Sequence, residues 1–190
     1  MAEVFAAAGY DTRLRSTNAS PSALFQTDQG YADSFLKDDT EDARVGVVAI
    51  KDIATLVEPF LVHVHMLEPH SPLNPPTEYY SAEMETVAEV PWDLTTLGGR
   101  QAMRNAWETL DESTKAAALR RTELLYDAEI RYTDAQLQAV LRAYEVAGLL
   151  ENTLVVVWSD HGEQMYEHGS LGHAGTLYRQ ENDATATFWA

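Results

Sequence analysis

Side chains able to bind metals or oxyanions are concentrated in residues 158–173, WSDHGEQMYEHGSLGH. This stretch holds three of the six histidines of the chain, one aspartate and two glutamates, and the other three histidines lie within 60–70, FLVHVHMLEPH. Carboxylate oxygens and imidazole nitrogens are common ligands of divalent metals. The two clusters therefore indicate a metal site or an oxyanion site. The simpler alternative is that they are solvent-exposed polar loops.

Asp160 and His161 directly follow the apolar run NTLVVVWS, and Gly162 comes next. Because glycine permits a sharp bend, both side chains can turn toward one point, which makes them the first candidates for metal ligands. Two ligands do not complete a metal shell. The alternative is that Asp160 caps a following helix and that His161 is an ordinary polar residue.

His168 and His173 belong to a loop with three glycines, EHGSLGHAGTLY. Glycines allow the backbone to approach an anion closely, and an imidazolium there can bind an oxyanion or protonate a leaving group. His70 lies in EPHSP, where the flanking prolines hold the loop stiff. All three are candidate substrate contacts, although a solvated loop histidine is the alternative for His168 or His173 taken alone.

Two further groups are interpreted as structural. His63 and His65 are two residues apart in an apolar strand, so their side chains share one face. We expect them to be core or strand residues whose ring nitrogens have hydrogen-bond partners, and not site residues. Asp127, Glu129 and Asp134 could be mistaken for paired catalytic carboxylates, but Glu129 lies off the helix face that the two aspartates share. We expect these acids to be exposed or to cap helices, with no role in catalysis.

The elements that must position these residues alternate between helices and apolar strands. Helices are predicted to end at Gly9 and to span 42–56 and 113–149, the last as one long helix or two abutting ones. Strands are expected over 12–16, 60–67 and 152–159, a loop over 17–42, and short helical pieces with a break at Gly98 and Gly99 between 77 and 112. Continuously apolar strands joined by helices favour a parallel sheet covered on both faces, where ligands bind beyond the carboxyl ends of the strands.

Composition limits the partners of the chain. Its 190 residues, 45% of them hydrophobic, suffice for one domain with a sizeable core. The formal charge of -17 argues against nucleic acid or an anionic membrane surface as a partner, and an anionic substrate would need a bound cation or local positive groups. Cysteine is absent, which excludes disulfides and thiolate ligands. No basic-hydrophobic leader and no run of about 18 apolar residues occurs, so neither a signal peptide nor a membrane segment is expected.

Six segments, in order, resemble the sulfatase family of the alkaline phosphatase superfamily. They are AAAGYDT, DQGYADSF, PFLVHVHMLEPHSPLNPP, LYDAEIRYTDAQL, GLLENTLVVVWSDHGE and EHGSLGHAGTLY. The resemblance implies an α/β fold, an alkaline phosphatase-like sandwich with a largely parallel sheet flanked by helices and incomplete at both ends. Residues 1–190 would form part of a catalytic domain. The implied activity is metal-dependent hydrolysis of sulfate esters through a formylglycine nucleophile.

The resemblance also implies roles for individual residues. Asp160 and His161 match metal ligands, with Ca²⁺ as the first choice and Mg²⁺ or Mn²⁺ as alternatives. His70 and His173 match catalytic residues that contact the sulfate or the leaving oxygen, and His168 is a third candidate substrate contact. The implied partner is a small-molecule or carbohydrate sulfate ester. The sequence does not assign a localisation, although the family would suit a periplasmic or extracellular one.

The chain departs from the family pattern in its first part. The first strand with its acidic ligands and the Cys/Ser-x-Pro-Ser-Arg nucleophile motif are not found, and ASPSAL (19–24) is rejected as the nucleophile because Ala19 takes its position and no arginine follows Ser22. RLRSTNAS (13–20) replaces the Gly-Lys-x-x-His stretch of many members. We expect an internal piece of a larger protein that is inactive as an isolated chain. The alternatives are a phosphoglycerol transferase or phosphodiesterase of the same superfamily, and a non-catalytic metal-binding or interaction module.

Overall fold

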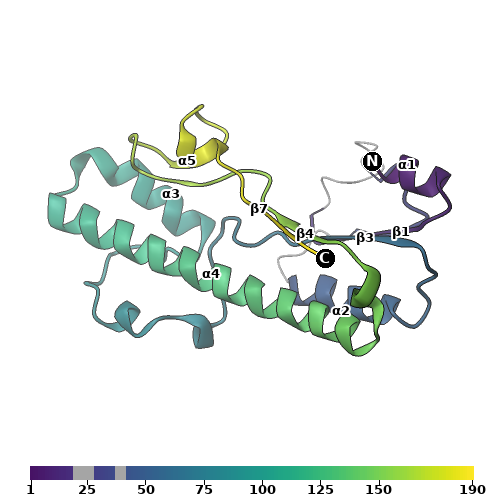
Figure 1. Ribbon diagram of the computed structural model, residues 1–190. Helices are drawn as coiled ribbons and strands as arrows, with labels where there is room; N and C mark the ends of the chain where they lie inside the picture. Colours follow the sequence, from purple (N-terminus) through teal and green to yellow (C-terminus); the bar gives the residue numbers. More distant parts are fainter. Residues whose placement is uncertain (19–27, 37–41) are drawn as a thin grey trace. The chain divides into compact units, whose positions relative to one another are not determined.

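The computed structural model describes residues 1–18, 28–36 and 42–190 (Figure 1). The segment ASPSAL lies outside these ranges. The described residues form two compact units, Met1–His70 with Thr133–Leu149 and Ser71–Tyr132 with Leu150–Ala190. Each unit is considered separately below. Both take residues from α4 (Glu112–Val146), which is one continuous helix, as one of the two sequence-based alternatives predicted.

The first unit contains a three-stranded parallel sheet in the order β2-β1-β3. Its elements are α1 (Ala2–Ala7), β1 (Asp11–Ser16), β2 (Asp33–Leu36), α2 (Asp42–Asp52) and β3 (Phe60–His65). The predicted parallel sheet is thereby confirmed, and α2 packs on β1 and β3. The prediction of a loop throughout 17–42 was wrong at β2, a strand of only four residues that parallel pairing to β1 holds in place.

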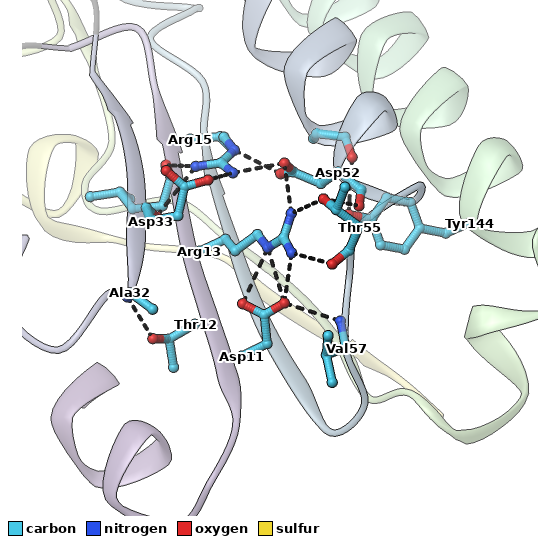
Figure 2. Close-up of polar contacts among 12 residues, drawn as sticks. Asp11, Thr12, Arg13, Arg15, Ala32, Asp33, Asp52, Thr55, Val57 and Tyr144 are labelled. Atoms are coloured by element: carbon cyan, nitrogen blue, oxygen red, sulfur yellow. Dashed lines mark hydrogen bonds and ion pairs between the residues drawn. The ribbon is translucent and has the colours of Figure 1, made fainter.

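Buried arginines on β1 tie the sheet to the end of α2 (Figure 2). Arg15 donates from Nε and Nη2 to the two carboxylate oxygens of Asp52, both at 2.7 Å, and Arg13 Nη1 donates to the same carboxylate at 3.1 Å. Burial opposes the charge on Arg15, but hydrogen bonds to Asp52 and Asp33 outweigh it and raise the pKa of Arg15. One carboxylate at the last residue of α2 is thus shared by two strand arginines, and Asp11 and Asp33 each pair with one of them.

The two strand histidines have neighbouring hydroxyl groups as partners, as the sequence predicted. Tyr31 Oη lies 2.8 Å from His63 Nδ1, and Ser16 Oγ lies 2.7 Å from His65 Nδ1. Burial, followed by the nearby His65, lowers the pKa of His63. Both rings therefore have hydrogen-bond partners within the first unit.

The second unit contains α3 (Leu97–Ala106), which begins where a break had been predicted. Gly98 and Gly99 lie in its first turn, and Thr96 caps it by accepting the Gly99 N–H at 3.0 Å. A β-carbon at Gly99 would lie 1.8 Å from the carbonyl oxygen of Asp93, so glycine is needed there for space. Short 3₁₀ turns complete the helical parts, η1 (Thr77–Tyr79), η2 (Ala82–Glu85), η3 (Trp107–Thr109) and η4 (Leu149–Asn152).

The core of the second unit joins α3, α4 and the loops beside them. Met103 of α3, Leu124 and Leu125 of α4, and Leu171 pack together with little or no exposed surface. Glu129 of α4 is also buried, at 2% exposure, and accepts the backbone N–H of Asn74 at 2.7 Å. The expectation that Glu129 is exposed or caps a helix was therefore wrong, because the proline-rich loop presents an amide to it.

The remaining strands of the second unit pair in antiparallel fashion. They are β4 (Val155–Trp158) with β7 (Ala186–Trp189) and β5 (Gln164–Met165) with β6 (Leu171–Gly172), and α5 (Arg179–Asn182) lies between β6 and β7 in the chain. The strand predicted at 152–159 therefore forms, but the ladder described for it is antiparallel. Within the described ranges, none of the helices has both the length and the apolarity that crossing a bilayer requires.

Replacement of Asp52 by asparagine should destabilise the first unit by about 3 kcal/mol, because it removes the buried counter-charge of two arginines. The matched control is Asp33→Asn, since Asp33 pairs with Arg15 but its side chain is 62% exposed, and it should cost less than about 1 kcal/mol. Urea unfolding of both variants measures the difference. Equal losses would contradict a dominant role for Asp52.

Candidate functional site

A short hairpin brings the polar residues of the second unit together. β5 and β6 pair Gln164 with Gly172 and Met165 with Leu171. Continuing this antiparallel register by one residue sets Glu163 opposite His173. His173 Nδ1 lies 2.7 Å from Glu163 Oε2, as that register requires.

His161 completes the cluster from two residues before Glu163. Its ring centroid lies 4.0 Å from that of His173. One ligand atom from each of His161, Glu163 and His173 lies within 4.8 Å of the other two. Two metal–ligand bonds of about 2.0–2.2 Å span at most about 4.4 Å, so small side-chain movements would bring the three donors around one ion. The three residues therefore form a candidate metal centre.

The ring of His161 is oriented by its own backbone neighbour. His161 Nδ1 lies 2.7 Å from the carbonyl oxygen of Gly162, an acceptor, so Nδ1 carries the proton and donates it. In the neutral ring Nε2 then has the lone pair that can bind a metal. The His161 side chain is 37% exposed, whereas those of His173 and Glu163 are 24% and 11% exposed. His161 is thus the most exposed of the three side chains and Glu163 the most buried.

Gly162 allows this arrangement because there is no room for a side chain. A β-carbon at this position would lie 2.2 Å from the carbonyl oxygen of Gln180 in α5. The Gly162 N–H donates to the carbonyl oxygen of Glu181 at 2.9 Å. The glycine of the Asp-His-Gly sequence therefore lets the backbone pass directly against α5.

Asp160 lies beside the cluster without belonging to its closest group. Its Oδ1 is 3.7 Å from His161 Nε2 and accepts the His161 backbone N–H at 3.0 Å, and its side chain is 77% exposed. The structure thus brings the predicted pair Asp160 and His161 together. The sequence-based prediction did not include Glu163. The register of the β5–β6 hairpin identifies it, because it sets Glu163 opposite His173.

A pocket of about 460 Å³ adjoins the cluster, with His161, His173, Thr176 and Glu181 in its lining. Buried Glu181 holds the loop that forms its wall, because it accepts the N–H groups of Gly175 at 3.2 Å and Thr176 at 3.0 Å and the Thr176 hydroxyl at 2.7 Å. These hydrogen bonds, led by the Thr176 hydroxyl, lower the pKa of Glu181. The cavity is of the size that small-molecule ligands occupy.

Another predicted contact, His168, lies outside this cluster. The exposed His168 stacks on Tyr178, with 3.6 Å between ring centroids, and its Nε2 is 3.0 Å from Gln180 Oε1. His168 is therefore engaged with residues near α5. His70 belongs to the first unit, so its participation stays a prediction.

Comparison with known proteins adds a family and a fold. A family model described as Sulfatase matches residues 1–186. The iduronate 2-sulfatase of Mus musculus is 27% identical over 178 residues, covering 85% of this chain and 31% of the relative. The arylsulfatase of Clostridium perfringens is 30% identical over 118 residues, covering 58% and 24%. The chain thus spans less than a third of the length of these relatives.

A solved structure shows the same fold. The phosphonate monoester hydrolase of Agrobacterium radiobacter superposes with a TM-score of 0.69 at 17% identity, covering 99% of this chain and 52% of that one. At this identity the likeness shows the fold alone.

The hydrogen bonds of Glu181 predict a pH-dependent pocket wall. Because the folded pKa is lowered, ionised Glu181 stabilises the loop above its unfolded pKa of about 4.3, and this stabilisation is lost as the pH falls through the folded pKa. Amide-exchange protection of Gly175 and Thr176, measured by NMR, should fall over that range. Glu181→Gln should lower it already at neutral pH, whereas the control Glu151→Gln, at an exposed glutamate, should not. Unchanged protection in Glu181→Gln would refute this role.

Proposed function

The chain belongs to the sulfatase family, and from this premise we propose that the protein hydrolyses sulfate esters with a divalent cation held by His161, Glu163 and His173. The observation that carries the proposal is the grouping of these three donors within 4.8 Å beside a pocket of about 460 Å³. A strongly acidic chain repels an anionic ester, so a cation at this place would offset the repulsion locally.

Each residue of the cluster has a distinct part in the proposal. His161 offers Nε2, because Nδ1 is committed to the Gly162 carbonyl. Asp160, 3.7 Å from that nitrogen, is close enough to join as a further ligand. When bound, the cation would polarise the ester and stabilise negative charge on its oxygens. Glu163 fixes the ring of His173 through Nδ1, which sets the direction in which the imidazole faces the pocket.

His173 has an alternative role in the proposal. Its Nδ1 is hydrogen-bonded to Glu163, so only Nε2 remains, and this nitrogen either binds the cation or contacts the sulfate group or the leaving oxygen. His70 and His168 stay proposed substrate contacts on the family resemblance alone. The substrate class is a small-molecule or carbohydrate sulfate ester.

The donor set bears on the identity of the cation. The family resemblance favours Ca²⁺, with Mg²⁺ or Mn²⁺ as alternatives, but Ca²⁺ and Mg²⁺ prefer oxygen ligands. His161 and His173 offer nitrogen, which suits ions such as Zn²⁺ and Fe²⁺, whereas Glu163 and Asp160 offer oxygen, which suits Ca²⁺, Mg²⁺ and Mn²⁺. Of the ions that the resemblance implies, Ca²⁺ and Mn²⁺ are the two to compare.

A second candidate function is hydrolysis or transfer of phosphate or phosphonate esters. The shared fold with a phosphonate monoester hydrolase supports keeping it, because the same metal cluster would serve a tetrahedral phosphorus centre. The substrate assay separates the two candidates.

Turnover of an aryl sulfate and an aryl phosphate by the full-length protein tests the proposal. We expect faster hydrolysis of the sulfate, loss of activity with a chelator, and recovery with Ca²⁺ or Mn²⁺. His161→Ala and Glu163→Gln should each lower kcat/KM at least about 100-fold, while Glu151→Gln, at an exposed glutamate, should leave it within about twofold. Activity that resists chelation would refute the metal role, and turnover of the phosphate alone would favour the second candidate.

A further inference from the structure

The guanidinium group of Arg100 is buried in the second unit and finds no hydrogen-bond partner in the part of the chain that the structure describes. Arg100 is 2% exposed, and its three side-chain nitrogens have no hydrogen-bond acceptor within the described ranges. Arginine stays charged inside proteins, and a buried charge is costly unless it is paired. A buried polar group left without a partner in a native fold calls for a water, an ion or a ligand.

Helix α3 brings a second cation to the same place. Arg104 lies four residues after Arg100, so the two side chains share one helix face. Arg104 is exposed, and its Nη2 would lie 3.5 Å from a β-carbon built at Gly172 of β6. The arginine pair therefore lies beside the hairpin that carries Glu163 and His173.

The nearest acid does not neutralise this pair. Burial and then Arg104 lower the pKa of Arg100, while Glu163 and Tyr166 act in the opposite direction. Glu163, however, is hydrogen-bonded to His173 at 2.7 Å, and Arg100 forms no ion pair within the described part of the chain. Two positive charges thus face one carboxylate that already has a partner.

We propose that Arg100, with Arg104, forms an oxyanion subsite that binds an acidic group of the substrate beside the β5–β6 hairpin. A carboxylate or sulfate group presents two oxygens to the guanidinium fork, and it satisfies several of the donors that Arg100 now leaves unpaired. Exposed Arg104 makes the first contact with the incoming group. The anion site stands on the arginines alone, whereas its assignment to the substrate rests on the proposed function.

This subsite specifies the substrate class further. The ligand carries a negative group in addition to the ester that the metal cluster receives. Carboxylate and sulfate share the chemistry that Arg100 recognises, so inorganic sulfate and acetate serve as the two probes.

Calorimetric titration of the purified, chelator-treated protein with sodium sulfate and sodium acetate, each at the same ionic strength as a sodium chloride reference, tests the subsite. We expect saturable binding of at least one oxyanion at one site and no such binding of chloride. Arg100→Met should weaken that binding at least tenfold. The matched control is Arg120→Gln, because Arg120 already pairs with Glu83 and Glu123 at an exposed position, and it should change binding less than twofold.

Thermal unfolding supplies a second readout. Arg100→Met removes an unpaired charge from the interior, so its Tm in oxyanion-free buffer should equal or exceed that of the native protein. Should Arg100→Met fail to fold, Arg100→Lys keeps the charge and loses the fork, and it should still weaken binding at least threefold. Absence of binding by the native protein, or equal binding by the folded variants, would overturn the proposal and leave buried water as the partner of Arg100. Because no metal is present, these outcomes are independent of the test of the metal cluster.

Discussion

The antiparallel register of one two-residue ladder governs the candidate site. Since Gln164 pairs with Gly172, Glu163 must face His173, and His161 joins them only because Gly162 passes against α5 without a side chain. Glu181 fixes the loop on the other side of His173. Backbone constraints therefore set the geometry of the candidate site, and its side chains supply the donor atoms.

The distribution of charge distinguishes the buried arginines of the two units. The chain carries 13 basic residues against 30 acidic ones, so each buried cation matters. Arg13 and Arg15 form ion pairs with Asp52, Asp11 and Asp33 and serve the first sheet. Arg100, in contrast, is buried and has no hydrogen-bond partner among the described residues. A divalent cation at the His161 cluster would offset the nearby carboxylates, and an anion at Arg100 would offset its buried charge.

Much of this could be predicted from the sequence where signals are local. The apolar runs of β3 and β4 and the long periodicity of α4 were visible, as was the adjacency of Asp160 and His161. The predictions that failed concern residues whose partners lie in another segment of the chain. The place of Glu163 beside His173 depends on a hairpin register, and the burial of Glu129 depends on an amide supplied by another loop. Gly99 signalled a break but is required by the close approach of Asp93. No single stretch of sequence contains these partners.

The central claim is that imidazole nitrogens of His161 and His173 bind one cation. Electron–nuclear double resonance of the Mn²⁺-loaded protein, with ¹⁵N-labelled histidine, measures this directly. Coupling of the manganese to two histidine nitrogens, reduced to one in His161→Ala, is the result expected from the cluster. A bound manganese coupled to no histidine nitrogen would contradict it.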